Sequence, residues 1–331
     1  MAAIVEQSAT IIYNPAAGPA DLAATMQRIA ARWREAGWEI DIKPTRAAGH
    51  ATVLAAEAAA EGTKLVLAAG GDGTLGEVVN GLAQSETMMG VLPAGTANSF
   101  ARELKLPLPG LLHENHLLAA SDALMAGSVQ KIDLGSTLGS SGDVKHYWVL
   151  WAGTGADSFM VKEIEPRPKW SKRIGWPSYI VHGLPALSQF SHVHAQVEVD
   201  SIQFEDDYVL VLISNCQRYA GGFVTLSQDA KVDDGLLEVW LFGGRGLASM
   251  SRHAVRVLRG QPSREEDAFL LKGTEIKIHT EPLMPVQTDG DPSGKTPLHC
   301  KIVPGALSLL TPQSAPDSLF QVKGPTLLST L

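Results

Sequence analysis

The stretch that decides the fold is residues 64–82, with the sequence KLVLAAGGDGTLGEVVNGL. An apolar run at Lys64–Ala69 predicts a buried strand, and the periodicity of Leu75–Leu82 predicts a helix. Between them, the cluster Gly70–Thr74 lets the backbone turn sharply and approach a ligand without interference from Cβ atoms. Because the first turn of the following helix presents unpaired N–H groups, this stretch predicts a phosphate-binding turn.

The sequence on either side continues to alternate strands with helices. The expected elements are strands at Thr10–Tyr13, Trp38–Ile42 and Met89–Leu92, helices at Leu22–Trp33 and Ala51–Glu61, and a helix that ends near Met125. This alternation predicts an N-terminal α/β domain with a mainly parallel sheet. Loops at Asn14–Gly18, Thr45 and Pro93–Asn98 follow three of the strands, so we expect them to meet the glycine cluster at the carboxyl edge of the sheet, where ligands bind.

Beyond Ile132, short strands become the rule. Residues 193–199 alternate apolar with polar side chains, as in a strand with one exposed face. Further elements are expected as strands at Tyr147–Trp151, Tyr208–Ser214, Leu236–Leu241, Thr274–His279, Leu298–Ile302 and Ala306–Leu310, and as helices at Ser178–Gln189 and Leu247–Arg259. The pattern predicts a C-terminal antiparallel β-sandwich, with an open barrel as the alternative. We therefore expect domains at 1–130 and 131–310, with a tail of about 311–331 that can pack back on the first.

Composition excludes several classes of protein. The chain has 331 residues, and 45% of them are apolar, which suffices for two folded domains and excludes disorder as the main state. Its 27 basic and 35 acidic residues give a net charge of −8, which disfavours general nucleic-acid binding. Two cysteines, Cys216 and Cys300, cannot form a disulfide framework. Since residues 1–8 lack the basic start of a secretory signal and no apolar run is long enough to span a bilayer, we expect a cytoplasmic protein.

The glycine cluster differs from two common phosphate-binding loops. No lysine follows it, and its spacing is not that of the dinucleotide-binding fingerprint. Asp72 would repel a phosphate group unless a divalent cation lay between them, so its presence favours a Mg²⁺-nucleotide complex. The alternative is an ordinary turn in which Asp72 only caps the helix.

Three segments together resemble the catalytic domain shared by diacylglycerol, sphingosine and ceramide kinases, namely Asn14–Gly18, Gly70–Gly81 and Leu92–Arg102. The resemblance continues through Ile132–Gly135, Lys172–Tyr179, Asn215, Gly221–Gly222, Asp233–Leu236 and Asp289–Asp291, and it is closest to the soluble bacterial lipid kinases. It covers nearly the whole chain in order. The resemblance implies a lipid kinase of phospholipid metabolism that transfers the γ-phosphoryl group of ATP to a hydroxyl of a diacylglycerol-like or sphingoid lipid.

The resemblance also implies which residues bind the nucleotide. The matching positions are Asn14, Pro15, Ala16, Ala17, Gly18, Thr45, Gly70, Gly71, Asp72, Gly73, Thr74, Leu75, Gly76, Glu77, Gly95, Thr96 and Asn98. It further implies a structural Mg²⁺ held by Asp234 with the backbone carbonyls of Lys231 and Leu236. From the residues alone, Asp233–Gly235 is more typical of a hairpin turn before a strand.

Two acidic residues are implied in catalysis, Asp72 in the glycine cluster and Asp291 near the end of the chain. Transfer to an alcohol needs a carboxylate close to the attacking hydroxyl. Asp291 ends the segment Asp289–Asp291, which matches the family's Asp-Gly-Glu position, whose last residue is thought to be the base. The alternative is again a turn, because Asp-Gly is common between two strands.

The match departs from the family pattern at four positions. Ala17 replaces a common serine, Gly76 a usual asparagine, and Ser99 a common aspartate that helps to organise the cations in relatives. At the fourth position, Asp291 is one methylene shorter than the usual glutamate. These changes predict slow turnover rather than none.

The segment Lys162–Trp176 is the candidate for contact with a membrane, because it interleaves basic residues with Trp170 and Trp176. Arginines also recur on one face of the expected helix Leu247–Arg259, where a solvated charged face is the simpler interpretation. Apolar residues of Ser178–Gln189 could line an acyl-chain pocket. His192 and His194 have no metal-ligand spacing and are expected on a solvated strand face.

The sequence therefore predicts an ATP- and Mg²⁺-dependent lipid kinase with a lipid partner at a membrane surface and no nucleic-acid partner. One alternative is a kinase for a soluble alcohol, as in NAD kinases, which share the Gly-Gly-Asp-Gly loop. The other is a nucleotide-binding regulatory protein that senses lipid without transferring phosphate, which the residues Gly76 and Ser99 make credible.

Overall fold

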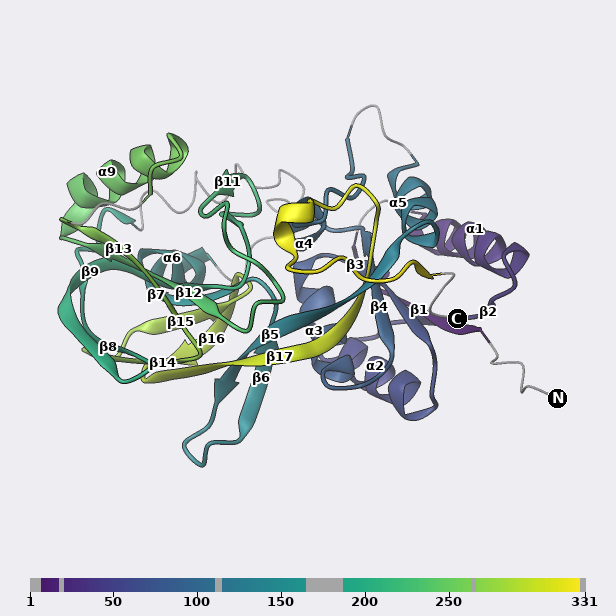
Figure 1. The fold of residues 1–331 in the computed structure, drawn as a ribbon, viewed down its shortest axis with the longest axis horizontal. Coiled ribbons are helices and arrows are strands. Elements are labelled where there is room, and N and C mark those ends of the chain that lie inside the picture. Colours follow the sequence, from purple (N-terminus) through teal and green to yellow (C-terminus); the bar gives the residue numbers. More distant parts are fainter. Residues whose placement is uncertain (1–6, 18–20, 111–114, 165–186, 263–265, 328–331) are drawn as a thin grey trace. The chain divides into compact units, whose positions relative to one another are not determined.

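The computed structural model describes residues 7–17, 21–110, 115–164, 187–262 and 266–327 (Figure 1). The chain divides into two units. Unit 1 comprises Met1–Asp133 and Gly305–Leu331, and unit 2 comprises Leu134–Pro304. Strands β5 (Ser128–Leu138) and β17 (Leu298–Thr311) each contribute residues to both units. Within the described part of the chain, no helix is both long and apolar enough to cross a membrane.

Unit 1 is built on a parallel sheet. Its strands are β1 (Ser8–Tyr13), β2 (Glu39–Pro44), β3 (Leu65–Gly70), β4 (Met88–Pro93) and the end of β17. They lie in the order β17-β4-β3-β1-β2, and every neighbouring pair is parallel. Both β3 and β4 are buried throughout, as expected for central strands covered on two faces. The predicted α/β fold with a mainly parallel sheet is confirmed.

Helices cover both faces of this sheet. They are α1 (Leu22–Glu35), α2 (His50–Ala60), α3 (Asp72–Leu82), the short α4 (Ser99–Glu103) and α5 (His116–Met125). On one face, Trp33 Nε1 of α1 donates to Ser121 Oγ of α5 at 2.8 Å. On the other, α2 and α3 pack so closely that a Cβ on Gly81 would lie 2.4 Å from the carbonyl oxygen of Thr52. Figure 1 shows the two helix pairs on opposite sides of the strands.

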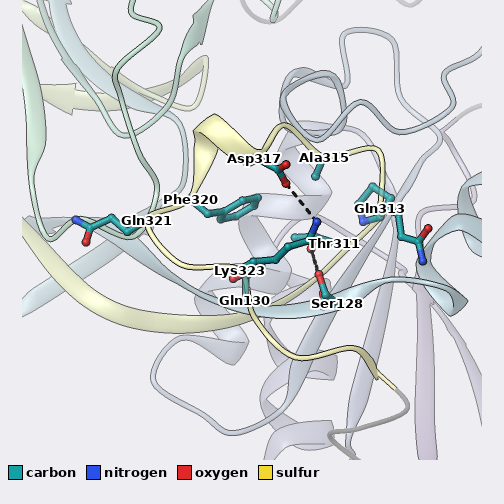
Figure 2. A pocket seen from close by; sticks show the side chains of 10 residues that line it. Ser128, Gln130, Thr311, Gln313, Ala315, Asp317, Phe320, Gln321 and Lys323 are labelled. Atoms are coloured by element: carbon teal, nitrogen blue, oxygen red, sulfur yellow. Dashed lines mark hydrogen bonds and ion pairs between the residues drawn. The ribbon is translucent and has the colours of Figure 1, made fainter.

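The described part of the C-terminal tail, up to Leu327, hydrogen-bonds to β5 and the residue before it. The Val129 amide donates to Pro325 O at 2.8 Å, and the Leu327 amide donates to Gly127 O at 3.0 Å. Ten residues line a cavity of about 280 Å³ beside this tail, shown in Figure 2: Ser128, Gln130, Thr311, Pro312, Gln313, Ala315, Asp317, Phe320, Gln321 and Lys323. None of the residues expected to bind nucleotide lines this cavity.

Unit 2 is an antiparallel β-sandwich. Its strands, besides parts of β5 and β17, are β6 (Val144–Trp148), β7 (Trp151–Gly155), β8 (Val193–Val199), β9 (Ile202–Ser214), β10 (Arg218–Tyr219), β11 (Val224–Thr225), β12 (Leu237–Gly243), β13 (Ala268–Gly273), β14 (Glu275–Glu281), β15 (Pro285–Thr288) and β16 (Asp291–Lys295). Its helices are α6 (Ala156–Ile164) and α9 (Gly246–Leu258). The expected alternation holds in β8, where Val193, Ala195 and Val197 are buried while His194 and Gln196 are exposed. The predicted sandwich is confirmed, and the barrel alternative is not adopted.

Predicted elements differ from the structure at three places, and one further predicted helix is not tested. The predicted strand Tyr147–Trp151 is broken between β6 and β7, and the two strands expected at Leu298–Ile302 and Ala306–Leu310 form the single strand β17. Helix α3 begins at Asp72, three residues before the expected Leu75. The helix expected at Ser178–Gln189 lies mostly outside the described residues.

Candidate functional site

The loops expected to bind nucleotide leave one edge of the unit 1 sheet. The sheet register pairs Tyr13 with Pro44 and Ala69, and it pairs Gly70 with Pro93, so β1 to β4 all end at this edge. Helices α1 and α3 follow the adjacent strands β1 and β3 and lie on opposite faces, which makes the gap between these strands a topological switch point. In open α/β sheets, ligands bind in the crevice at such a point.

Asn14 connects the first loop to the glycine cluster. Its backbone N–H donates to Ala69 O at 3.0 Å, and its side-chain amide donates to Thr74 Oγ1 at 3.4 Å. The same side chain accepts the N–H of Ala16 at 2.9 Å, and the Thr45 amide donates to Tyr13 O at 2.8 Å. Hydrogen bonds thus tie the loops that follow β1 and β2 to the ends of β1 and β3.

Glycine is required where the loops touch. A Cβ on Gly95 would lie 2.3 Å from the Cα of Gly71, and a Cβ on Gly70 would lie 2.5 Å from the Cβ of Thr74. Asn98, in the left-handed conformation with φ 51°, accepts the Gly95 N–H at 2.9 Å and donates to the Gly95 carbonyl at 2.8 Å. The loops after β3 and β4 therefore meet backbone to backbone, as a phosphate-binding turn needs.

Asp72 is the first residue of α3, and Gly71 is the N-cap, which has no side-chain capping hydrogen bond. The Asp72 carboxylate instead accepts the hydroxyl of Ser99 at 3.2 Å and the N–H of Phe100 at 3.4 Å, so it binds the start of α4. Burial raises the pKa of this carboxyl above its ordinary value, although the hydrogen bonds from Ser99 and Phe100 oppose the shift. A half-buried aspartate whose carboxyl has a raised pKa, beside a phosphate-binding turn, is a candidate for binding a cation.

The other expected nucleotide positions differ in role. Glu77 Oε2 accepts the N–H of Ala51 at 3.0 Å, so this carboxylate caps the first turn of α2. Leu75 is buried, whereas Gly73 and Thr96 are exposed. Pro15 is exposed, and the Ala17 amide donates to Asn14 O at 3.0 Å. Gly76 has open space where a Cβ would be. Gly18 lies outside the described residues.

The segment Asp289–Asp291 forms a tight hairpin in unit 2. Asp289 and Gly290 have φ of 50° and 87°, which matches the two-residue turn that Asp-Gly favours between β15 and β16. The carboxylate of Asp289 accepts three backbone N–H groups, from Val149, Leu150 and Trp151. Asp291 is the exposed first residue of β16. The hairpin turn is therefore real, and it presents Asp291 to solvent.

Sequence reasoning missed a partly buried network behind this hairpin. One end of the Gln287 amide donates to Asp157 Oδ2 at 3.0 Å, and the other accepts the Gly290 N–H at 2.9 Å. The Tyr219 hydroxyl also donates to Asp157 Oδ2 at 3.0 Å. Burial raises the pKa of Asp157 and raises that of Tyr219 well above its ordinary value. Asp157 lies at the start of α6, directly after β7.

The loop before β12 contains the expected cation ligands. Asp234 Oδ1 accepts the Leu236 N–H at 3.1 Å, while its Oδ2 lies 4.0 Å from Lys272 Nζ. The same ammonium lies 3.4 Å from Glu238 Oε1, and the buried Oε2 of Glu238 has no hydrogen-bond partner among the described residues. The carboxylates of Asp234 and Glu238 both lie near Lys272, and carboxylate oxygens are ligands that a hard divalent cation prefers.

Two family models match the chain. The diacylglycerol kinase catalytic domain matches residues 8–137, and the YegS C-terminal NAD kinase beta sandwich-like domain matches residues 152–311. The first match contains the switch-point loops. The second contains the Asp234 loop and the Asp291 hairpin.

Named relatives match over nearly their whole length. A diacylglycerol kinase of Bacillus subtilis (strain 168) is 30% identical over 87% of this chain and 91% of its own. A diacylglycerol kinase of Staphylococcus carnosus (strain TM300) is 28% identical over 95% of this chain and 98% of its own. Two crystal structures from Bacillus anthracis str. Sterne, of which one is described as a diacylglycerol kinase, are each 24% identical. Their TM-scores are 0.74 and 0.69 over 93% and 94% of this chain and 98% of theirs, and they show the same fold.

Proposed function

The chain belongs to the diacylglycerol kinase family, and from that membership we propose a division of labour between its two units. The protein is a lipid kinase, and ATP is its phosphoryl donor. We assign the triphosphate of ATP to the switch point of unit 1, and we assign the base that receives the proton of the lipid hydroxyl to unit 2. The single observation that carries this proposal is the contact between the loops after β3 and β4, where only glycine fits.

In unit 1, the phosphate groups would accept N–H groups from the glycine turn and the first turn of α3. Asn14 and Thr74 hold the neighbouring loop against this turn through their 3.4 Å hydrogen bond. Asp72 would face a divalent cation that accompanies ATP and spreads the negative charge of the triphosphate when bound. Ser99 keeps that carboxylate oriented by donating its hydroxyl.

In unit 2, Asp291 would accept the proton of the attacking hydroxyl as the phosphoryl group is transferred. Its exposure and its position next to a rigid turn support that role. A second Mg²⁺ would be held by Asp234 with the carbonyls of Lys231 and Leu236, where the carboxylates of Asp234 and Glu238 suit a structural cation. Its function would be to hold the loop before β12.

The acceptor we propose is a diacylglycerol rather than a sphingoid base, because the matching relatives are named diacylglycerol kinases. Such an acceptor resides in a bilayer, so the enzyme would bind peripherally to the membrane surface. The segment Lys162–Trp176, expected from sequence to make that contact, lies outside the described residues from residue 165 onward.

Transfer of labelled phosphate from ATP tests the assignment. Purified protein is incubated with γ-labelled ATP, Mg²⁺ and either diacylglycerol, a sphingoid base or NAD, and the products are separated by chromatography. We expect labelled phosphatidic acid from the wild type and at least a hundredfold less from Asp291→Asn, as is typical for loss of a general base. Asp229→Asn is the matched control, since Asp229 is also an exposed aspartate of unit 2.

Nucleotide binding separates the competing interpretations. Asp291→Asn should bind ATP as the wild type does, because we place ATP in unit 1. A labelled soluble product would identify a kinase for a soluble alcohol. Binding of ATP without any labelled product would identify a regulatory protein, and a fully active Asp291→Asn variant would remove Asp291 from the reaction.

A further inference from the structure

Helix α9 presents an apolar surface that the described part of the chain leaves exposed. Leu247, Ser251, Ala254 and Leu258 follow helical spacing and form one stripe, with Val255 beside it. The side chains of Leu247, Val255 and Leu258 are 46%, 44% and 73% exposed. In the rest of the helix only Ser249 and His253 are buried.

Polar contacts, rather than apolar packing, hold the helix to unit 2. His253 Nε2 donates to Gly243 O at 2.8 Å, and the Gly246 amide donates to Ser191 O at 2.7 Å. Arg252 and Arg256 both pair with Asp267, just before β13, and Figure 1 shows α9 beside β9 and β13. The inner face of the helix is therefore attached to unit 2 near Gly246 and near His253, while the apolar stripe on the other face is exposed.

The charge around this stripe is basic in an acidic protein. The chain carries a net charge of −8, yet residues 239–262 contain Arg245, Arg252, Arg256 and Arg259 and no acidic residue. Arg245 pairs with Asp207, and Arg252 and Arg256 share the carboxylate of Asp267, so two carboxylates face four arginines. Arg259 has no ion pair within the described residues. We define the α9 surface as Leu247, Ala254, Val255 and Leu258 together with Arg252 and Arg259.

An apolar stripe beside more arginines than carboxylates fits a layer of anionic phospholipid headgroups. Arginines near such a layer are attracted to its charge, and leucine side chains are stabilised when they enter the acyl boundary. A second copy of this chain fits less well, because a symmetric contact would place the arginines of one copy against those of the other. We infer that the α9 surface docks the enzyme on an anionic phospholipid bilayer; this inference rests on the proposed lipid acceptor.

Co-sedimentation with lipid vesicles tests the inference. Vesicles of phosphatidylglycerol mixed with phosphatidylcholine are compared with vesicles of phosphatidylcholine alone. We expect Leu258→Glu to lower the partition coefficient on the mixed vesicles at least about tenfold, the loss expected for one buried leucine. Arg259→Glu should lower it several-fold and should weaken its dependence on ionic strength.

Matched variants control for exposure and charge. Ile202→Glu replaces an apolar residue of unit 2 that is 62% exposed, and Arg28→Glu reverses an exposed arginine of unit 1; neither should change partition. The inference is overturned if Leu258→Glu partitions as the wild type does, or if both kinds of vesicle bind equally. It is also overturned if Leu258→Glu changes the oligomeric state on gel filtration without changing vesicle binding.

Turnover of a short-chain diacylglycerol dissolved in water separates this inference from the proposed function. Leu258→Glu should keep wild-type turnover on that substrate while losing turnover on vesicle-borne diacylglycerol. If the wild type binds anionic vesicles through α9 but phosphorylates no diacylglycerol in either form, the docking surface stands and the proposed acceptor fails.

Discussion

Substitution of two aspartates of one hairpin should affect different properties: at Asp289 the stability of the fold, and at Asp291 phosphoryl transfer. The Asp289 carboxylate accepts the N–H groups of Val149 at 2.9 Å, Leu150 at 2.8 Å and Trp151 at 3.2 Å, and these three residues are 2%, 2% and 5% exposed. Asp289→Ala leaves three buried donors without their acceptor. Each such loss costs about 1–3 kcal/mol, and partial relaxation or a water molecule would satisfy some of them. We expect a total loss of about 3–5 kcal/mol in the free energy of unfolding.

Asp291→Ala removes an exposed carboxylate, so its effect on unfolding should stay within about 0.5 kcal/mol while phosphoryl transfer is lost. Urea unfolding followed by tryptophan fluorescence measures the first quantity, because Trp148, Trp151 and Trp240 all lie in unit 2. Asp289→Asn serves as an intermediate variant, since it keeps one acceptor oxygen. Equal urea midpoints for Asp289→Ala and Asp291→Ala would refute the structural role that we assign to Asp289.

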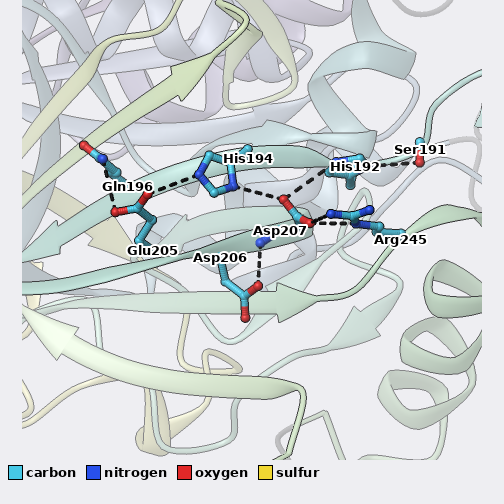
Figure 3. A network of polar contacts seen from close by, with 8 residues as sticks. All are labelled: Ser191, His192, His194, Gln196, Glu205, Asp206, Asp207 and Arg245. Carbon is cyan, nitrogen blue, oxygen red and sulfur yellow. Dashed lines mark hydrogen bonds and ion pairs between the residues drawn. The ribbon is translucent and has the colours of Figure 1, made fainter.

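Three further predictions concern the glycine turn, the buried carboxylate and a surface histidine. Gly95→Ala should abolish ATP binding measured by calorimetry, because its Cβ would lie 2.3 Å from the Gly71 Cα, whereas the control Gly76→Ala, with open space, should bind normally. If both variants bind ATP, the loop contact is not part of the site. The raised pKa of Asp72 means that the folded state binds its proton more tightly, so wild-type stability should fall relative to Asp72→Asn as pH rises from about 3.8 through the raised pKa. If the difference in urea midpoint between the wild type and Asp72→Asn stays constant over this pH range, the prediction is wrong. His194 lies between Asp207 and Glu205, whose hydrogen bonds raise its pKa (Figure 3). The stability that protonated His194 contributes should be complete below about pH 6.5 and lost as pH rises through the raised pKa. The difference in urea midpoint between the wild type and His194→Gln should therefore shrink between pH 6 and pH 9. A constant difference would refute the charge effect.

The parallel sheet and its loops were predictable because each depends on neighbouring residues. The apolar run before Gly70 and the helical periodicity after it lie within one short stretch. The same local logic fails at β17, where Pro304-Gly305 is typical of a turn. There the Gly305 amide donates to Asp133 Oδ1 at 2.7 Å, and the strand continues past the pair. The decisive partner lies 172 residues away in the sequence.

The break between β6 and β7 has the same origin. Residues 147–151 have the composition of one strand, yet Val149 and Leu150 give their N–H groups to Asp289, about 140 residues further along the chain. Strand β16 was missed for a different reason. Its sequence DPSGK contains Pro292 and Gly294, which are poor strand formers, and the hairpin with β15 holds it extended.

The candidate site also contains residues that the sequence predicts and residues that it does not. Motif spacing was enough to bring Asn14, the glycine turn and Asn98 to one edge, because strand ends of a parallel sheet meet there. It could not identify Gln287 and Asp157, which are 130 residues apart and carry no motif. Their roles become clear only in the folded structure, where the Gln287 amide bonds both to the carboxylate of Asp157 and to the Gly290 N–H of the hairpin.

Two of the departures expected from the resemblance to the family, at Gly76 and Ser99, fall where the structure can accommodate them. Gly76 replaces an asparagine at a point with open space around the Cβ position, so that position is not constrained by packing. Ser99 replaces an aspartate, but its hydroxyl donates to Asp72, where a second carboxylate would repel the first. By contrast, Gly70 and Gly95 have no room for a side chain, because a Cβ would lie 2.5 Å from the Thr74 Cβ and 2.3 Å from the Gly71 Cα, respectively. Since the geometry of the turn depends on these glycines, the substitutions should change how cations are arranged around the phosphates rather than whether the turn can hold them.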